Sequence, residues 1–421
     1  MPDSQPQPHP PSDSSGPSGR SDPAALLLCG ARLTDGRTVD VRLGGGRIEA
    51  VGTAGSLAPG PARTGGTRVD LSGYLLLPAP AEPHAHGDTA LSAEHPGPVS
   101  FAPEDVQRRA TEAALLQLGH GATAVRAHVR VGDVQGLGAL VAVLRARRSL
   151  RGLAELTAVA MPRLLTGVAG ADGRAMLRDA VKMGASVVGG CPDLDPDPTG
   201  YVETVLEVAS EHGCPVDLHT DAADPARLSR LAAMAGGLRP GVTIGPCAGL
   251  ARLPEEAAAR AADQLAAAGV TVVCLPQGGC CGADHRGAAP VRLLRAAGVR
   301  VSAGSGAVRD LSNPVGRGDP LEAAYLLAAA QGLRPEDAYD TVSASARAVL
   351  GLPEVRVEAG FPADLLAVRG DRLAGALSLA YSRIVVHRGR VVARTSAVRE
   401  YCDSAAAVEL GLPRQGRGEL S

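Results

Sequence analysis

The sequence predicts a protein of the α/β class, with a (β/α)8 barrel of the TIM type and a small composite β side domain formed by its N- and C-terminal segments. After Pro78, apolar strand-like segments alternate with helical ones, and eight strand candidates can be counted. Before Pro78 and after residue 351, short strand-like segments with glycine-rich turns predominate. Apolar strands separated by helices are typical of a closed parallel barrel, whereas short strands joined by tight turns favour a small antiparallel unit.

The eight barrel strands are predicted from runs rich in Val, Ala and Leu. The first ends at His84 and His86, and the others span residues 122–131, 155–162, 186–191, 215–221, 242–247, 270–276 and 299–305. The clearest helical segments between and after them are residues 103–120, 200–213, 254–269, 319–332 and 335–351. The segment 254–269 opens with a proline and closes with a glycine, as helices prefer.

Changes in composition predict the domain boundaries. Residues 1–22 are rich in Pro, Ser and Gly, bury little and are expected to form a disordered tail. Residues 23–78 together with 352–402 are expected to form a composite β-sandwich side domain, with residues 79–351 as the barrel. Residues 403–421 are expected to be a frayed C-terminal tail.

Charge and composition exclude several classes of function. The chain of 421 residues has a formal net charge of −2, so no global field attracts nucleic acid or an anionic membrane. No apolar run reaches the ~18 residues that a membrane span needs, and no secretory signal pattern opens the chain. The eight cysteines include no CxxC pair and indicate free thiols in a reducing compartment. We therefore expect a cytoplasmic protein with a small-molecule substrate or ligand, no nucleic-acid or membrane partner, and possible homo-oligomerisation.

The segment Glu82–Asp88 contains the first candidate functional residues, His84 and His86. Side chains two residues apart on a strand point to the same side, so both imidazoles are expected at one end of the first barrel strand. His219 lies near the end of the fifth strand candidate, and parallel barrel strands all end at one mouth. Three histidines with an open fourth position form a catalytic zinc or iron site that activates water, so one divalent metal is predicted as the cofactor. The alternative is that these histidines make ordinary hydrogen bonds.

Several segments resemble those of a known family. They are EPHAHGDTAL at residues 82–91, VRAHVRVGD at 125–133, VDLHTD at 216–221, SNPVGRGDPLEAA at 312–324 and AGFPADLLAV at 359–368. All five resemble segments of the amidohydrolase superfamily, and within it of the cytosine deaminase-like branch. The resemblance runs from about Leu26 to about Arg394. It implies a barrel with a composite β side domain and a metal-dependent hydrolase of non-peptide C–N bonds, which usually deaminates a cytosine-like ring or cleaves an amide.

The chain departs from this branch at three positions. The resemblance implies a glutamate three residues after His219, where this chain has Ala222. It implies a histidine at the end of the sixth strand and an aspartate at the end of the eighth, where this chain has Pro246 and Gly306. Each proton-transfer group of this kind contributes roughly 10²–10⁴ in rate, so the replacements predict impaired or lost deamination. The single lysine, Lys182, precedes the fourth strand, which excludes a two-metal site bridged by a carbamylated lysine.

Three residues near the predicted mouth are possible substitutes for the missing groups. Asp310 lies beyond Gly306, Asp221 follows His219, and Cys281, beside Cys280, lies in the loop after the seventh strand. Turn capping and ordinary packing are the competing interpretations for all three.

Two further residues have candidate roles. Arg163 occupies the place of a glutamine that, by the resemblance, bonds the substrate, so it is a candidate for substrate binding; a surface ion pair is the alternative. His128 is interpreted as structural.

Three functions remain open from the sequence. One is a metal-dependent amidohydrolase with degraded proton-transfer residues, whose catalytic residues are not assigned. Another is a catalytically inactive homologue that binds a small molecule or a partner through the old pocket. The third is a structural or assembly role through the β side domain, which the sequence does not forbid.

Overall fold

The structure is a computed structural model of the chain, and it describes residues 25–57, 66–93, 97–132, 136–278 and 287–397. The two predicted tails, residues 1–22 and 403–421, lie outside the described residues.

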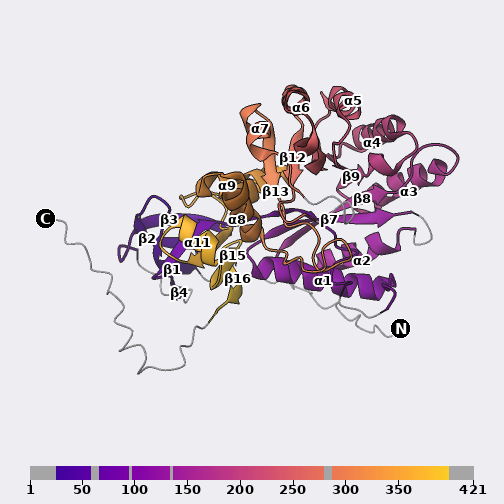
Figure 1. The fold of residues 1–421 in the computed structure, drawn as a ribbon. Coiled ribbons are helices and arrows are strands. Elements are labelled where there is room, and N and C mark those ends of the chain that lie inside the picture. Colours follow the sequence, from indigo (N-terminus) through magenta and orange to yellow (C-terminus); the bar gives the residue numbers. More distant parts are fainter. Residues whose placement is uncertain (1–24, 58–65, 94–96, 133–135, 279–286, 398–421) are drawn as a thin grey trace, which may run out of the picture.

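Eight parallel strands form the barrel (Figure 1). In chain order they are β6 (Glu82–Ala85), β7 (Ala124–Val131), β8 (Glu155–Pro162), β9 (Val187–Gly190), β10 (Val216–Thr220), β11 (Val242–Pro246), β12 (Thr271–Cys274) and β13 (Arg300–Ala303). Each pairs with its neighbour in the chain, and a parallel bridge between Ala85 and Gly306 brings the first and last strands together. The predicted (β/α)8 fold is confirmed, and each predicted barrel strand overlaps an observed one.

One helix of the surrounding layer follows each barrel strand. These helices are α1 (Pro103–Gly119), α2 (Gly138–Ser149), α3 (Gly170–Met183), α4 (Pro198–His212), α5 (Pro225–Ala235), α6 (Glu255–Ala268), α7 (Val291–Ala296) and α8 (Pro320–Gln331). Two short 3-10 helices, η3 (Pro192–Leu194) and η4 (Ala248–Arg252), precede α4 and α6.

Local sequence signals fix the ends of several of these helices. The Asp197 side chain accepts a hydrogen bond from the Gly200 amide at the start of α4, and Asp319 does the same for Leu321 at the start of α8. Such side-chain caps satisfy amides that have no partner within the helix. Gly213 ends α4 with a φ of +64°, a conformation that side chains with a Cβ rarely adopt.

Two short helices connect the barrel to the C-terminal strands. They are α9 (Pro335–Val342) and α10 (Ala344–Val349). The sequence predicted one helical segment over 335–351, but the chain bends at Ser343, whose φ and ψ are −112° and −93°. The Ser343 hydroxyl donates a hydrogen bond to the Tyr339 carbonyl, so the side chain binds a backbone group of α9 next to the bend.

The two ends of the chain build a second sheet beside the barrel (Figure 1). Its strands lie in the order β16 (Arg390–Thr395), β15 (Arg383–His387), β14 (Leu365–Arg369), β5 (Tyr74–Pro78), β1 (Leu26–Arg32), β2 (Thr38–Gly44) and β3 (Arg47–Thr53). Strand β4 (Thr67–Asp70) also pairs with β1, and helix α11 (Leu373–Leu379) joins β14 to β15. Strands from both ends of the chain therefore share one hydrogen-bonded sheet, as the sequence predicted.

The central strands of this side sheet are buried on both faces. Leu75 and Leu77 of β5 pack into the large core of the barrel, whereas Leu76 between them packs into the separate core of the side sheet. Strand β14 alternates in the same way, with Leu366 facing the barrel core and Leu365 the other core. Because strand side chains alternate between faces, these strands fix the side sheet against the barrel.

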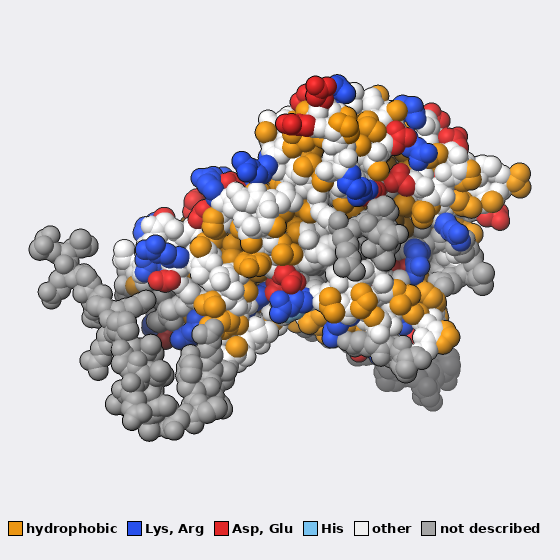
Figure 2. Space-filling view, in the orientation of Figure 1, with side chains coloured by type: hydrophobic (Ala, Val, Ile, Leu, Met, Phe, Trp, Pro, Cys, Tyr) orange, Lys and Arg blue, Asp and Glu red, His pale blue; other side chains and the backbone are white. Residues whose placement is uncertain are grey.

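The face of the molecule in Figure 2 carries no dominant charge of one sign. Figure 2 shows Lys and Arg side chains interspersed with Asp and Glu over the face it presents. Within the described residues, no helix is both long and apolar enough to cross a lipid bilayer.

Candidate metal centre

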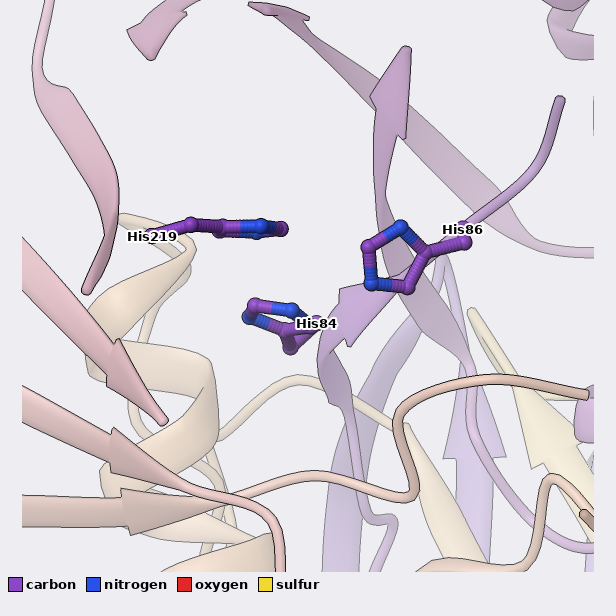
Figure 3. Close-up of side chains that lie close together, drawn as sticks. All are labelled: His84, His86 and His219. Atoms are coloured by element: carbon purple, nitrogen blue, oxygen red, sulfur yellow. The ribbon is translucent and has the colours of Figure 1, made fainter. Parts of the chain in front are cut away.

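Three histidines converge at the carboxyl ends of two barrel strands. His84 lies in β6, His86 directly follows it, and His219 lies in β10 on the other side of the barrel. One ring nitrogen from each lies within 4.8 Å of the other two, and Figure 3 shows the three side chains gathered around one space. The His84 and His219 rings stack with centroids 4.3 Å apart, and each lies 5.2 Å from the His86 ring. The structure thus brings together the three residues that the sequence predicted as metal ligands.

The surroundings keep these imidazoles neutral. Burial, assisted by the neighbouring His128, lowers the pKa of His84 and of His219 well below the ordinary value. Burial also lowers the pKa of His86 to about 4, although the charges of Asp88 and Asp310 oppose the effect. A histidine must be unprotonated to bind a metal, so at neutral pH the cluster is in a ligating state.

A fourth histidine, His128 of β7, completes the cluster. Its ring centroid lies 4.2 Å from that of His84 and 4.6 Å from that of His219. Among the described residues, neither of its ring nitrogens has a hydrogen bond. His84, His128 and Asp217 form a second group whose ligand atoms lie within 4.8 Å of one another. We interpreted His128 as structural, and the structure places it in contact with the predicted ligands.

A buried ion pair lies beneath the histidines. Arg126 of β7 donates to Asp217 of β10 over 2.8 Å, and both side chains are almost fully buried. The other Asp217 oxygen lies 3.4 Å from Nε2 of His128. Burial acts to raise the pKa of Asp217, but His128 and Arg126 hold it below the ordinary value. The carboxylate therefore remains charged and faces His128.

Glu82 closes the barrel beneath His84. Its carboxylate accepts hydrogen bonds from the amide and the hydroxyl of Ser305, which follows β13, and from the amide of His84. Burial raises the pKa of Glu82 to about 7, against the opposing effect of the Ser305 hydrogen bonds. The first and last strands are thus joined by a side chain as well as by the backbone.

Glu82, Arg126 and Asp217 were not assigned a role from the sequence. The signal was present, because each lies two residues before a clustered histidine on the same strand, before His84, His128 and His219 respectively. Side chains two apart share a face, so an inward histidine predicts an inward neighbour one layer below it.

At the three positions that depart from the family pattern, no side chain has an atom that could bind a metal. Ala222 is buried with a φ of +56°, and Pro246 is the last residue of β11. Gly306 has a φ of +70°, and a Cβ built on it would lie 3.2 Å from Cδ1 of Leu275. An aspartate there would need a small shift of Leu275 and a left-handed backbone, which Asp tolerates better than most residues.

Both carboxylates predicted as possible substitutes already have partners. Asp310 accepts hydrogen bonds from the Thr89 hydroxyl and from the amides of Ser312 and Asn313, the turn-capping arrangement considered above. Asp221 forms an ion pair with Arg252 and accepts a hydrogen bond from the Gly249 amide.

Neither Asp310 nor Asp221 belongs to a group of close ligand atoms in the described part of the chain. Arg163 is exposed just after β8, and Cys280 and Cys281 lie outside the described residues.

Comparison with known proteins identifies relatives over most of the chain. Residues 99–393 match the model of the amidohydrolase family. The pterin deaminase of Rhizobium rhizogenes is 29% identical over 310 residues, which cover 69% of this chain and 70% of that protein. The N-isopropylammelide isopropyl amidohydrolase of a Pseudomonas strain is 24% identical over 311 residues, or 70% of this chain and 75% of that protein.

Solved structures extend the likeness to the fold. N-isopropylammelide isopropylaminohydrolase from Burkholderia multivorans superposes with a TM-score of 0.78 at 28% identity, covering 89% of this chain and all of that one. The 5-methylcytosine deaminase of Klebsiella pneumoniae, liganded with 5-fluorocytosine, superposes with a TM-score of 0.77 at 24% identity, covering 90% of this chain and all of that one.

Proposed function

Because the chain belongs to the amidohydrolase superfamily, in its cytosine deaminase-like branch, we propose that it is a metal-dependent hydrolase of non-peptide C–N bonds. Its substrate class is a small nitrogen-rich ring that loses an amino or alkylamino group. The observation that carries this proposal is the convergence of His84, His86 and His219 at the barrel mouth, with ligand atoms within 4.8 Å of one another.

The residues present fit one divalent metal, zinc or iron. Three neutral imidazoles from two facing strands suit either ion. His84, His86 and His219 would hold the metal. When bound there, it would activate water for attack on the carbon of the C–N bond.

The other buried groups position these ligands. Asp217, held by Arg126, lies 3.4 Å from Nε2 of His128, and the His128 ring packs against the rings of His84 and His219. Glu82 accepts the His84 amide and ties that strand end to Ser305. Such supporting contacts hold ligands within the narrow limits that metal sites require.

A second candidate function has its own support. Ala222, Pro246 and Gly306 provide no acid or base where the family pattern has one. Without a group to deliver a proton to the leaving nitrogen, hydrolysis would be slow. The alternative is therefore an inactive homologue that binds a small molecule through the same mouth.

Metal content and turnover together distinguish the two functions. The protein is stripped with a chelator and reloaded with zinc or Fe²⁺. Bound metal is then counted, and ammonia or amine release is measured with pterin, cytosine and N-isopropylammelide. The proposal predicts about one metal per chain, lost in His219→Ala and retained in His212→Ala, an exposed histidine at the end of α4. Metal-dependent release from any of the three compounds supports the hydrolase.

The remaining outcomes decide against it. Stoichiometric metal with no release from the panel favours the inactive homologue, and failure to bind metal after reloading refutes the metal-dependent hydrolase. Ala222→Glu combined with Gly306→Asp restores two of the three missing groups. This double variant should then raise turnover if the loss of these groups limits the rate.

Several sequence predictions are retained here as proposals. They are the boundaries of the side domain and barrel, the cytoplasmic location, the absence of nucleic-acid partners and the possible homo-oligomer. Arg163 is kept as a candidate for substrate binding, with Asp310, Asp221 and Cys281 as possible substitutes for the missing groups.

A further inference from the structure

A cavity of about 610 Å³ lies at the end of the barrel opposite the histidines. Its wall includes residues at the amino-terminal ends of the strands, such as Ser186 before β9, Gly241 before β11 and Val299 before β13. Residues 348–351, at the end of α10 and beyond it, cover one side. In (β/α)8 barrels chemistry is placed at the carboxyl ends of the strands, while this end usually serves stability. A hollow of ligand size is therefore unexpected here.

The cavity follows from the small side chains at this end of the barrel. Among the described residues, 21 line the cavity; none of them is aromatic, and most are Gly, Ser, Thr, Pro or Val. Only 2% of the whole chain is aromatic, with no tryptophan. Small side chains at the amino-terminal ends of the strands leave this end of the closed barrel unfilled.

The wall combines apolar surface with guanidinium groups. Val187, Val242 and Val301 contribute apolar surface, and Thr243 and Thr271 add hydroxyls. Of the described residues in the wall, three are arginines, Arg126, Arg295 and Arg300, and one is a carboxylate, Asp340.

The carboxylate partners of two of these arginines lie outside the wall. Asp217 pairs with Arg126, and Asp337 pairs with Arg295. Arg300 donates to the Gly269 carbonyl. The lining itself is therefore richer in positive than in negative groups.

The inner wall of the cavity contains Arg126, a buried arginine that is held by hydrogen bonds. Its side chain is 2% exposed, donates to Asp217 over 2.8 Å and donates to the carbonyl of Val349, at the end of α10, over 2.5 Å. Its Nε has no hydrogen-bond partner among the described residues. Asp217 and the Val349 carbonyl hold this guanidinium in the inner wall, whereas Arg295 and Arg300 are the accessible donors for an anion.

We propose that this cavity binds a small organic acid, whose carboxylate meets the arginines and whose apolar body packs against the valines. Charge and shape favour this class over a neutral ring, since the wall supplies guanidinium donors. The site is separate from the histidine cluster, because Arg126 and Asp217 lie between the two. The proposal does not depend on the function proposed for the metal centre.

Benzoate and benzamide provide a matched pair of probes, with the same ring and with or without the charge. Binding is measured by calorimetry and thermal shift on chelated, metal-free protein, so that benzoate cannot bind through a metal. Benzoate should bind and raise Tm, and benzamide should bind at least tenfold more weakly. Inorganic phosphate tests whether the charge alone suffices, and it should bind more weakly than benzoate.

Variants locate the site. Ala348 is exposed and lines the cavity, so Ala348→Phe should fill the space and abolish the benzoate shift while leaving the core untouched. Arg300→Gln, also at an exposed position, should weaken benzoate about tenfold, as expected for loss of one charge-assisted hydrogen bond. Arg292→Gln is the control, an exposed arginine of α7 that does not line the cavity.

Three results would overturn the proposal. They are no benzoate binding by the wild type, equal binding of benzoate and benzamide, and unchanged benzoate binding in Arg300→Gln. The last test holds even if Ala348→Phe fails to fold, because Arg300 is a surface residue.

Discussion

Two regions of the molecule bury charged or titratable groups in opposite ways. Where the barrel meets the side sheet, Arg383 of β15 donates to both oxygens of Asp319 over 2.8 and 2.6 Å. In the same region, Arg347 of α10 donates to Asp364 over 3.0 Å, and Asp364 also binds His387 over 2.9 Å. At the barrel mouth, by contrast, four histidine rings lie with centroids 4.2 to 5.9 Å apart, and burial lowers the pKa of three of them.

The two regions differ in whether the protein itself supplies the opposite charge for each buried charged group. The junction pairs each buried cation with an anion and so serves stability within the fold itself. The mouth gathers like groups that repel one another once charged, and a metal ion would make their proximity favourable.

Removing one partner at the junction should have the largest effect. Asp319→Ala leaves Arg383, which is 4% exposed, without its carboxylate and should lower the free energy of unfolding by about 3–5 kcal/mol. Urea denaturation measures this loss. Because Asp319 also caps α8, Asp319→Ser is the control that retains the cap. If Asp319→Ser were as stable as the wild type, the ion pair would not be the source of stability.

The histidine cluster should respond to metal instead. Zinc at 100 times its dissociation constant should raise the free energy of unfolding of chelated wild type by about 2.7 kcal/mol. His219→Ala should lose this gain. The gain is measured against the variant's own metal-free stability, because truncating a buried side chain also leaves a cavity. His212→Ala should keep the full gain. Equal zinc stabilisation of wild type and His219→Ala would place the metal elsewhere.

The junction should also depend on pH in the acid range. Burial acts to raise the pKa of Asp364, but hydrogen bonds from His387 and the Arg388 amide, with the charge of Arg347, lower it from 3.8 to about 2. A carboxyl whose folded pKa is depressed stabilises the fold above its unfolded pKa, and this contribution of about 2 kcal/mol disappears as pH falls from about 4 to about 2. The stability difference between wild type and Asp364→Asn should therefore shrink over that interval. A difference that stays constant across it would contradict the assignment.

Removing an exposed ion pair should change the free energy of unfolding least, and this change is the reference for the buried pairs. Arg178 of α3 pairs with Glu211 of α4 over 2.9 Å, with side chains 32% and 41% exposed. Glu211→Gln should change the free energy of unfolding by less than about 1 kcal/mol, because solvent screens the pair. A loss as large as that of Asp319→Ala would show that burial is not what separates the two kinds of pair.

Much of the fold, and the three histidines of the candidate site, could be predicted from the sequence. The barrel strands were predicted because each is a short apolar run bounded by turn residues, and that pattern needs no knowledge of distant contacts. His84, His86 and His219 were predicted to converge because the ends of parallel strands meet at one mouth. The closeness of His128 to these rings was not predicted, since it depends on the diameter and register of the closed barrel.

The order of strands and helices and the position of the three histidines at strand ends followed from the sequence alone, as did the prediction that Ala222, Pro246 and Gly306 replace acidic and basic groups. These are local properties, set by periodicity and residue type. The folded structure was needed to show that Asp310 and Asp221 have other partners, that Asp217 faces His128, and that the opposite end of the barrel is hollow. Those features depend on which side chains meet across the barrel, and residues far apart in the chain meet only once all eight strands have closed.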